Sequence, residues 1–295
     1  MSHYRGRFAP TPSGPLHFGS LVAALGSFLD ARHAGGQWLL RIEDIDPPRC
    51  PAGAGDTILR QLEAFGLQWD GPVHYQHARH AAYQQALEYL RDAGLAYPCS
   101  CSRKQWHGHS VYPGWCRHGV REPCKPQAWR LRSDRGLRPI AWHDRLYGEQ
   151  AFDPADLGDV VLKRKDEFWA YQLAVVVDDA EQGITDVVRG ADLLDNTPWQ
   201  RQLQQALGLP EPRYLHLPLI VGADGQKLSK QNLAPALPCD DERVRPLLCR
   251  ALGALGQPLE TAQQYAPVAE QLEAAIARWD STRLQPVAQR QALDC

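Results

Sequence analysis

Two short segments far apart in the chain carry side chains suited to holding a polyphosphate. The first is a turn rich in proline and glycine that precedes the apolar stretch Leu21–Leu29. A helix starting there offers unpaired N–H groups and the positive end of its dipole; His17 and Ser20 add side-chain donors, and Gly19 allows close approach to the backbone. The second segment, Lys227–Gln231, places two lysines around a serine. Together the segments predict a two-part phosphate clamp.

An acidic group, Glu43-Asp44-Ile45-Asp46, follows the predicted strand Gln37–Ile42. Ligand sites of open parallel sheets form at the carboxyl ends of strands. One interpretation is a carboxylate cluster that binds the two metal ions of a phosphotransferase. The other assigns Glu43 to a cationic group of a substrate. Magnesium would then arrive with ATP and need few fixed protein ligands.

A third chemical pattern is a cluster of cysteines in an aromatic, glycine-rich stretch. Cys99 and Cys101 lie one residue apart, and Tyr112 and Cys116 follow. This pattern suits a structural tetrahedral zinc, which would order a small insert with little core of its own. The alternative is a set of free cysteines. Further side chains compete for the fourth ligand position: His107, His109, His118 and Cys124.

Length and composition bound the class of protein. The 295 residues are 44% apolar, which suits a globular protein of two or three domains. No apolar run approaches the roughly 18 residues of a membrane span. Residues Met1–Arg7 lack the apolar core of a signal peptide, so we expect a cytoplasmic protein with reduced cysteines. The net charge of −2 gives no overall sign of nucleic-acid binding.

Periodicity predicts the elements that must position these residues. Apolar spacing indicates helices over 55–65, 80–93 and 200–207, and helical structure from 239 to the end. Strands are expected over 128–132, 159–163, 168–177 and 214–221. The order is α/β, a small inserted module, α/β again and a helical tail.

Several motifs occur in the order found in one enzyme family. They are Arg7–Thr11, His17–Ser20, Leu40–Asp44, Tyr171–Asp179, Val188–Gly190 and Lys227–Gln231. On these motifs, which span about residues 5–235, the sequence resembles the glutamyl-tRNA synthetases, class I enzymes with a Rossmann-type parallel sheet core. The sequence departs from that pattern at Ser20, where the family has a second histidine, and at Leu228 and Gln231.

The 64 residues after Gln231 would not hold the additional anticodon-binding region of full glutamyl-tRNA synthetases. The chain is therefore similar to the shortened branch of the family. The resemblance implies that it activates glutamate with ATP without tRNA, giving glutamyl-adenylate. Transfer would then be to the queuosine base in the anticodon of tRNA(Asp).

The resemblance also implies roles for individual residues. Catalytic roles fall to His17, Lys227 and Lys230. Glutamate would contact Arg7, Phe8, Ala9, Pro10, Thr11, Glu43, Tyr171 and Arg189. ATP would contact His17, Gly19, Ser20 and Lys230. The zinc ligands would be Cys99, Cys101, Tyr112 and Cys116, with one structural zinc per chain, and magnesium would accompany ATP.

The resulting organisation is a class I catalytic core in two halves, 1–97 and 166–235. Between them lies a zinc-bearing α+β module, 98–165, and a helical region, 236–295, follows. We expect a monomer that does not associate with membranes. One alternative is a truncated glutamyl-tRNA synthetase that charges a tRNA 3′ end. The other is a zinc-dependent RNA-binding module that has lost catalysis; the lysines at 227 and 230 and His17 argue against it.

Overall fold

The computed structural model describes residues 4–135, 138–221, 235–285 and 289–291. The second half of the predicted phosphate clamp, Lys227–Gln231, lies outside the described residues. In the described part of the chain, no helix has the length and apolar character needed to cross a membrane.

The core is built from two sheets whose strands pair in parallel, except for the antiparallel pair of β6 and β7. β1 (Arg5–Phe8), β2 (Gln37–Ile42) and β3 (His74–Tyr75) pair in parallel, in that order. The second sheet has the order β7-β6-β10-β9, formed by Gly148–Phe152, Ile140–Asp144, Arg213–Leu217 and Asp186–Gly190. A hydrogen bond from Thr185 N to Arg5 O, 2.9 Å long, joins the starts of β9 and β1. The predicted α/β class with parallel strands is confirmed.

Helix α1 (Phe18–His33) lies between the parallel strands and the C-terminal helices. It begins where predicted, because the His17 imidazole caps it by accepting a hydrogen bond from Ser20 N. Its apolar residues are buried on almost every side, between the parallel strands and the C-terminal helices. This burial explains why apolar residues occur on all sides of the helix rather than along one stripe.

Helix α5 (Tyr171–Glu181) corrects a prediction. The aromatic and β-branched run 168–177 was expected to form a strand, and the structure shows that this expectation is wrong. Leu173, Ala174, Val175 and Val176 are all buried, because α5 packs between α3 (His80–Asp92), α6 (Thr197–Leu207) and β8 (Val161–Lys163). A helix buried on most sides shows no polar face, so its period cannot be distinguished from that of a buried strand.

The range predicted as an inserted module contains two different pieces. Strands β4 (Ala96–Cys99), β5 (Ala128–Leu131) and β8 form a small antiparallel sheet beside the cysteine-rich loop. The antiparallel hairpin of β6 and β7 instead joins the core, where β6 pairs in parallel with β10. A short helix, α4 (Pro154–Leu157), leads back toward β8.

The C-terminal region is helical, as predicted, with one exception. Helices α7 (Asp241–Ala254) and α8 (Val268–Arg278) pack on α1. The exception is β12 (Gln289–Gln291), which pairs in parallel with β11 (Leu219–Val221). The predicted strand 214–221 is divided at Pro218 into β10 and β11, since proline cannot donate a ladder hydrogen bond.

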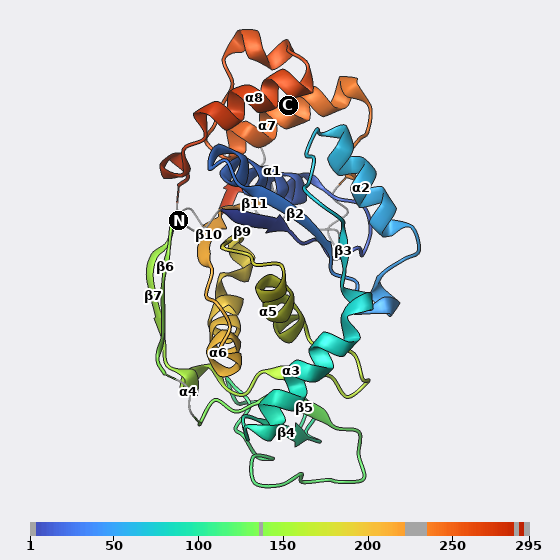
Figure 1. The fold of residues 1–295 in the computed structure, drawn as a ribbon, viewed down its shortest axis with the longest axis vertical. Helices are drawn as coiled ribbons and strands as arrows, with labels where there is room; N and C mark the ends of the chain where they lie inside the picture. The colour runs from blue at the N-terminus through green and yellow to red at the C-terminus, as the bar shows by residue number, and fades with distance from the viewer. Residues whose placement is uncertain (1–3, 136–137, 222–234, 286–288, 292–295) are drawn as a thin grey trace.

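Figure 1 shows the elements arranged along the long axis of the molecule. The helices α7 and α8 lie at one end, above α1 and the parallel strands, and β4 and β5 lie at the other end. Helix α2 (Ala54–Ala64) flanks the β1-β2-β3 sheet. This arrangement brings the carboxyl ends of β1, β2 and β9 to the start of α1; of these strands, only β2 was predicted from the sequence.

Candidate active site

A cavity of about 320 Å³ lies at the start of α1 and the ends of the parallel strands. It is lined by every predicted substrate or nucleotide residue that the structure describes. These residues are Arg7, Phe8, Ala9, Pro10, Thr11, His17, Gly19, Ser20, Glu43, Tyr171 and Arg189. Lys227 and Lys230, predicted to complete the site, fall outside the described residues. Segments remote in sequence therefore meet at one site, and the roles of the individual residues stay predictions.

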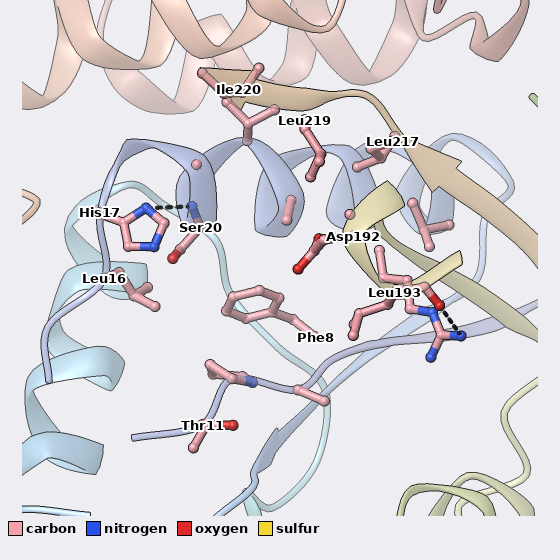
Figure 2. A pocket seen from close by; sticks show the side chains of 18 of the residues that line it. Phe8, Thr11, Leu16, His17, Ser20, Asp192, Leu193, Leu217, Leu219 and Ile220 are labelled. Atoms are coloured by element: carbon pink, nitrogen blue, oxygen red, sulfur yellow. Dashed lines mark hydrogen bonds between the residues drawn. The ribbon is translucent and has the colours of Figure 1, made fainter. Parts of the chain in front are cut away.

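The start of α1 offers donors to the cavity. His17 Nδ1 accepts a hydrogen bond from Ser20 N at 3.3 Å, so the proton of the neutral ring is on Nε2. Figure 2 shows His17 and Ser20 at the helix start, Phe8 between the helix and Thr11, and Asp192 further along the helix. An anion placed here would meet the Nε2–H donor and the positive end of the helix dipole.

Arg7 is held by an acidic partner. Its Nε and Nη2 donate to the two oxygens of Asp179 at 3.0 and 3.2 Å, a bidentate pair that is almost fully buried. Arg41 donates to the same carboxylate at 2.8 Å and lies 3.4 Å from Glu43. The edge of the Arg7 guanidinium that carries Nε and Nη2 is therefore already occupied. Asp179 compensates the charge of Arg7.

Glu43 is a buried carboxyl group whose charge is finely balanced. Burial raises its pKa to about 7, against the opposing effect of the Arg41 and Arg7 guanidinium groups. Asp179, beside the same arginines, has a pKa below its usual range, although burial alone would raise it. Near neutral pH, Glu43 therefore readily becomes the anionic partner of an incoming cation.

Arg189 differs from Arg7 because its charge is not compensated. It is 6% exposed and makes no ion pair within the described ranges. Its Nε donates to His216 Nε2 at 3.1 Å, and its Nη2 donates to Thr197 Oγ1 at 2.9 Å and to Leu193 O at 3.4 Å. Its Nη1 is buried with no hydrogen-bond partner among the described residues. A buried cation with a spare donor in a cavity wall is suited to a carboxylate ligand.

Tyr171 begins helix α5 and lines the same cavity. Burial raises the pKa of its phenol. The hydroxyl therefore stays protonated at neutral pH and can donate a hydrogen bond to a bound ligand.

A second, larger cavity of about 1180 Å³ adjoins the first and shares Ala9, Thr11, Glu43, Tyr171 and Leu193 with it. It extends to the cysteine-rich loop at Cys101. Cations line it, namely Arg49, Arg103, Arg130, Arg164 and Lys165, together with the aromatic rings of Phe168 and Trp169. Glu43, Asp46 and Asp166 line it as well, and Asp46 pairs with Arg49 and Arg164. The small cavity therefore opens into a charged, partly aromatic groove in which cations outnumber carboxylates.

The predicted metal ligands also come together. The Sγ atoms of Cys99, Cys101 and Cys116 lie within 4.8 Å of one another, and all three residues are buried. The Tyr112 hydroxyl lies 3.3 Å from Cys99 Sγ and 3.5 Å from Cys101 Sγ. The competing side chains His107, His109, His118 and Cys124 are exposed, and the search of the described residues does not group them with these three cysteines.

The distances in this cluster fit a bound metal ion. Cys101 and Cys116 Sγ are 3.6 Å apart, and two thiolates of a tetrahedral zinc lie ~3.8 Å apart. None of the described cysteines forms a disulfide. Burial opposes ionisation of Cys116, but hydrogen bonds from Arg121 N–H and Tyr112 lower its pKa to about 7. Burial raises the pKa of the Cys101 thiol to about 11, so a bound metal would have to ionise it. The spacing of the sulfur atoms fits a metal.

Sequence reasoning missed three residues that shape the site. Asp179, at the end of a recognised motif, orients Arg7 from 172 positions away. Asp192 lines the cavity three residues after Arg189, and His216 holds Arg189 from β10. The available signals were an acidic residue that ends a recognised motif, for Asp179, and an acidic residue two positions after the motif Val188–Gly190, for Asp192. No local signal marks His216, because its partners come from other strands.

Comparison with known proteins agrees with this arrangement. The family of "tRNA synthetases class I (E and Q), catalytic domain" matches residues 3–110 and 117–281. A glutamyl-Q tRNA(Asp) synthetase from Ectopseudomonas mendocina is 54% identical over 285 residues, covering 95% of each chain. The enzyme of that name from Chromobacterium violaceum is 57% identical over 248 residues, covering 81% of this chain and 82% of the relative.

Solved structures agree as well. A glutamate tRNA ligase from Elizabethkingia meningosepticum, solved in complex with its amino acid, superposes with a TM-score of 0.81 at 26% identity. The match covers 99% of this chain and 68% of that ligase. The chain is thus a class I tRNA synthetase, and it belongs to the glutamyl-Q tRNA(Asp) synthetase family.

Proposed function

We propose that this protein activates glutamate with ATP in the absence of tRNA and transfers it to the queuosine base at the anticodon wobble position of tRNA(Asp). The observation that carries the first half is Arg189, a buried guanidinium with an unpartnered Nη1 and no ion pair in the described chain. The names of the relatives motivate the second half.

The charged side chains of the cavity complement glutamate, which carries one ammonium group and two carboxylates. Arg189 would bind the side-chain carboxylate of glutamate, since the other carboxylate must remain free to react. Glu43 would accept hydrogen bonds from the ammonium group, which favours its ionised form. The Nη1 of Arg7 and the hydroxyl of Tyr171 are further candidate donors.

Activation requires one oxygen of the free carboxylate to attack the α-phosphorus of ATP. The bond between that phosphorus and the bridging oxygen breaks, and pyrophosphate leaves with the electron pair. Catalysis of this kind is mainly positioning and neutralisation of charge. His17 Nε2 and the first turn of α1 would serve the phosphates, with Ser20 as a hydroxyl donor, and magnesium would arrive bound to ATP. Lys227 and Lys230 would stabilise the leaving pyrophosphate.

In the second step a hydroxyl of queuosine's cyclopentene ring would attack the carbonyl carbon of the adenylate. AMP leaves with the bonding pair, and the departing phosphate takes up the hydroxyl proton. The larger cavity supports this step, because bases stack on aromatic rings such as Phe168 and Trp169 while cations contact phosphates. It shares its inner wall with the glutamate cavity.

The proposed metal is a structural zinc held by Cys99, Cys101, Tyr112 and Cys116, within the inserted module assigned to residues 98–165. When bound, zinc would neutralise the thiolates and fix the loop that carries them. That loop forms one end of the larger cavity, through Cys101 and Arg103. The metal would therefore support the groove rather than the chemistry.

Glutamate-dependent ATP–pyrophosphate exchange tests the first step. Arg189→Ala should lower the specificity constant for glutamate at least about 100-fold, because loss of a charge-assisted hydrogen bond in a buried site costs about 3 kcal/mol. Arg91→Ala, on the exposed face of α3, is the control and should leave exchange unchanged. Unchanged exchange in Arg189→Ala, with a normal melting temperature, would remove Arg189 from the site.

The acceptor is tested with ATP, labelled glutamate and separate tRNAs. We expect base-labile glutamate on tRNA(Asp) that contains queuosine, and none on tRNA(Asp) without it or on tRNA(Glu). Glutamate at the 3′ end of tRNA(Glu) would instead support a truncated glutamyl-tRNA synthetase. Absence of both exchange and transfer would support an RNA-binding protein without catalysis.

A further inference from the structure

Arg189 is oriented by a chain of hydrogen bonds across three neighbouring strands. Arg189 on β9 is the register partner of His216 on β10, and Asp144 lies at the end of β6 on the other side of β10. His216 Nδ1 lies 2.6 Å from Asp144 Oδ2, and both side chains are fully buried. The chain therefore runs from Asp144 through His216 to Arg189, and it ends in the wall of the small cavity.

The donor groups determine which ring nitrogen of His216 carries the proton in this series of hydrogen bonds. Arginine Nε always carries a hydrogen, so His216 Nε2 must accept, and the ring proton must be on Nδ1, donated to Asp144. Burial lowers the pKa of His216, which agrees with a neutral ring. Asp144 is itself fixed, because its Oδ1 accepts from Leu146 N and Tyr147 N, both at 3.0 Å.

We propose that Asp144 and His216 are positioning residues that hold Arg189 for the substrate carboxylate without cancelling its charge. Arg7, in the same cavity, shows the contrast, since its Nε edge is held by the Asp179 carboxylate. A carboxylate in place of His216 would fix Arg189 equally well but would compensate the charge that attracts glutamate. A neutral imidazole, held in one tautomer by Asp144, orients the Arg189 guanidinium and leaves its positive charge uncompensated. This inference rests on the proposed role of Arg189 in binding glutamate.

Asp144→Asn is the main test, because it is close in shape and keeps Oδ1 for the two backbone N–H groups. Its amide would donate to His216 Nδ1, move the ring proton to Nε2 and set that N–H against the Nε–H of Arg189. The glutamate KM in ATP–pyrophosphate exchange should rise about 10- to 100-fold. The ATP KM should not change, and kcat should change less than about threefold.

His216 variants provide the rescue experiment. In His216→Gln the side-chain oxygen can accept from Arg189 Nε, so the glutamate KM should stay within about fivefold of wild type. His216→Leu removes the acceptor and should match Asp144→Asn. His143→Leu and Glu149→Gln are matched controls. The first removes and the second makes neutral an exposed His–carboxylate contact of 2.7 Å between β6 and β7. They should leave both KM values unchanged.

The possible outcomes separate this inference from the proposed function. If the wild type shows no glutamate-dependent exchange, the proposed function fails first. If the wild type is active and Arg189→Ala is not, but Asp144→Asn keeps a normal glutamate KM, only the positioning role is overturned. Equal rises in the KM values for glutamate and ATP, or failure of His216→Gln to restore binding, would indicate a merely structural role and also overturn it.

Discussion

At the scale of single residues, two arginines in one cavity have different electrostatic states. Arg7 shares Asp179 with Arg41, whereas Arg189 is bound by neutral groups and has no ion pair in the described residues. Burying an uncompensated cation costs free energy, and such groups occur where a ligand later supplies the missing charge. Arg189 is always positively charged, whereas Glu43, in the same cavity, gains or loses its negative charge near neutral pH.

The raised pKa of Glu43 predicts a pH dependence of glutamate binding. Below about pH 7 Glu43 takes up a proton in the free protein and loses its attraction for the substrate ammonium group. The glutamate KM should therefore rise as the pH falls from 8 to 6. Exchange kinetics across this range provide the measurement. In Glu43→Gln the KM should be high at every pH; if that variant keeps the wild-type pH profile, another group is responsible.

At the scale of elements, the cysteine loop and helix α1 differ in what stabilises them. Helix α1 packs on strands and on α7 and α8, so its order follows from burial of apolar surface. The cysteine loop has only a small cluster around Tyr97 and Tyr112, with Trp106 and Trp115 partly buried against it. Such a loop needs a further source of order, which a metal bound by its thiolates would supply.

Metal removal should therefore affect the module and the core differently. We expect about one zinc per chain by elemental analysis of the wild type, and none in Cys101→Ser. That variant should lose transfer to tRNA at least tenfold more than glutamate-dependent exchange, because the loop borders the larger cavity and not the smaller one. Cys249→Ser, distant from the cluster, is the control. A metal-free wild type with full transfer activity would contradict the prediction.

At the scale of the whole molecule, one buried carboxylate accepts hydrogen bonds from segments that are far apart in the sequence. Asp30 in α1 accepts hydrogen bonds from Tyr4 at 2.5 Å, from Arg145 at 2.6 and 2.8 Å, and from Trp279 at 2.8 Å. These partners come from the residue before the first strand, the β6–β7 hairpin and the C-terminal region. The C-terminal region is thus bound to the core through Asp30 as well as through apolar packing.

Asp30→Asn should lower the free energy of unfolding by about 3 kcal/mol at pH 7, because it leaves the Arg145 guanidinium without its buried partner. Burial alone would raise the pKa of Asp30, but the Arg145 hydrogen bonds hold it below its usual value. This contribution is therefore fully present above about pH 5 and is lost as the pH falls below about 4.

Urea unfolding at pH 7 and pH 3 provides the measurement. The control is Asp92→Asn, whose exposed pair with Arg91 should contribute less than about 1 kcal/mol. The difference between the Asp30 variant and wild type should shrink at pH 3. Equal stability of the two Asn variants at pH 7 would show that Asp30 does not link these regions.

The sequence by itself determined the features that act over a few residues. The start of a helix after the turn at His17, the strand Gln37–Ile42 and the clustering of Cys99, Cys101 and Cys116 all follow from short-range spacing. Tertiary structure decided the rest. It made 171–181 a helix, because burial on several sides hides the period. It also paired Arg7 with Asp179, set the charge of Glu43 through burial and joined Arg189 to His216. Ion pairing and desolvation depend on distances in space, which spacing along the chain does not specify.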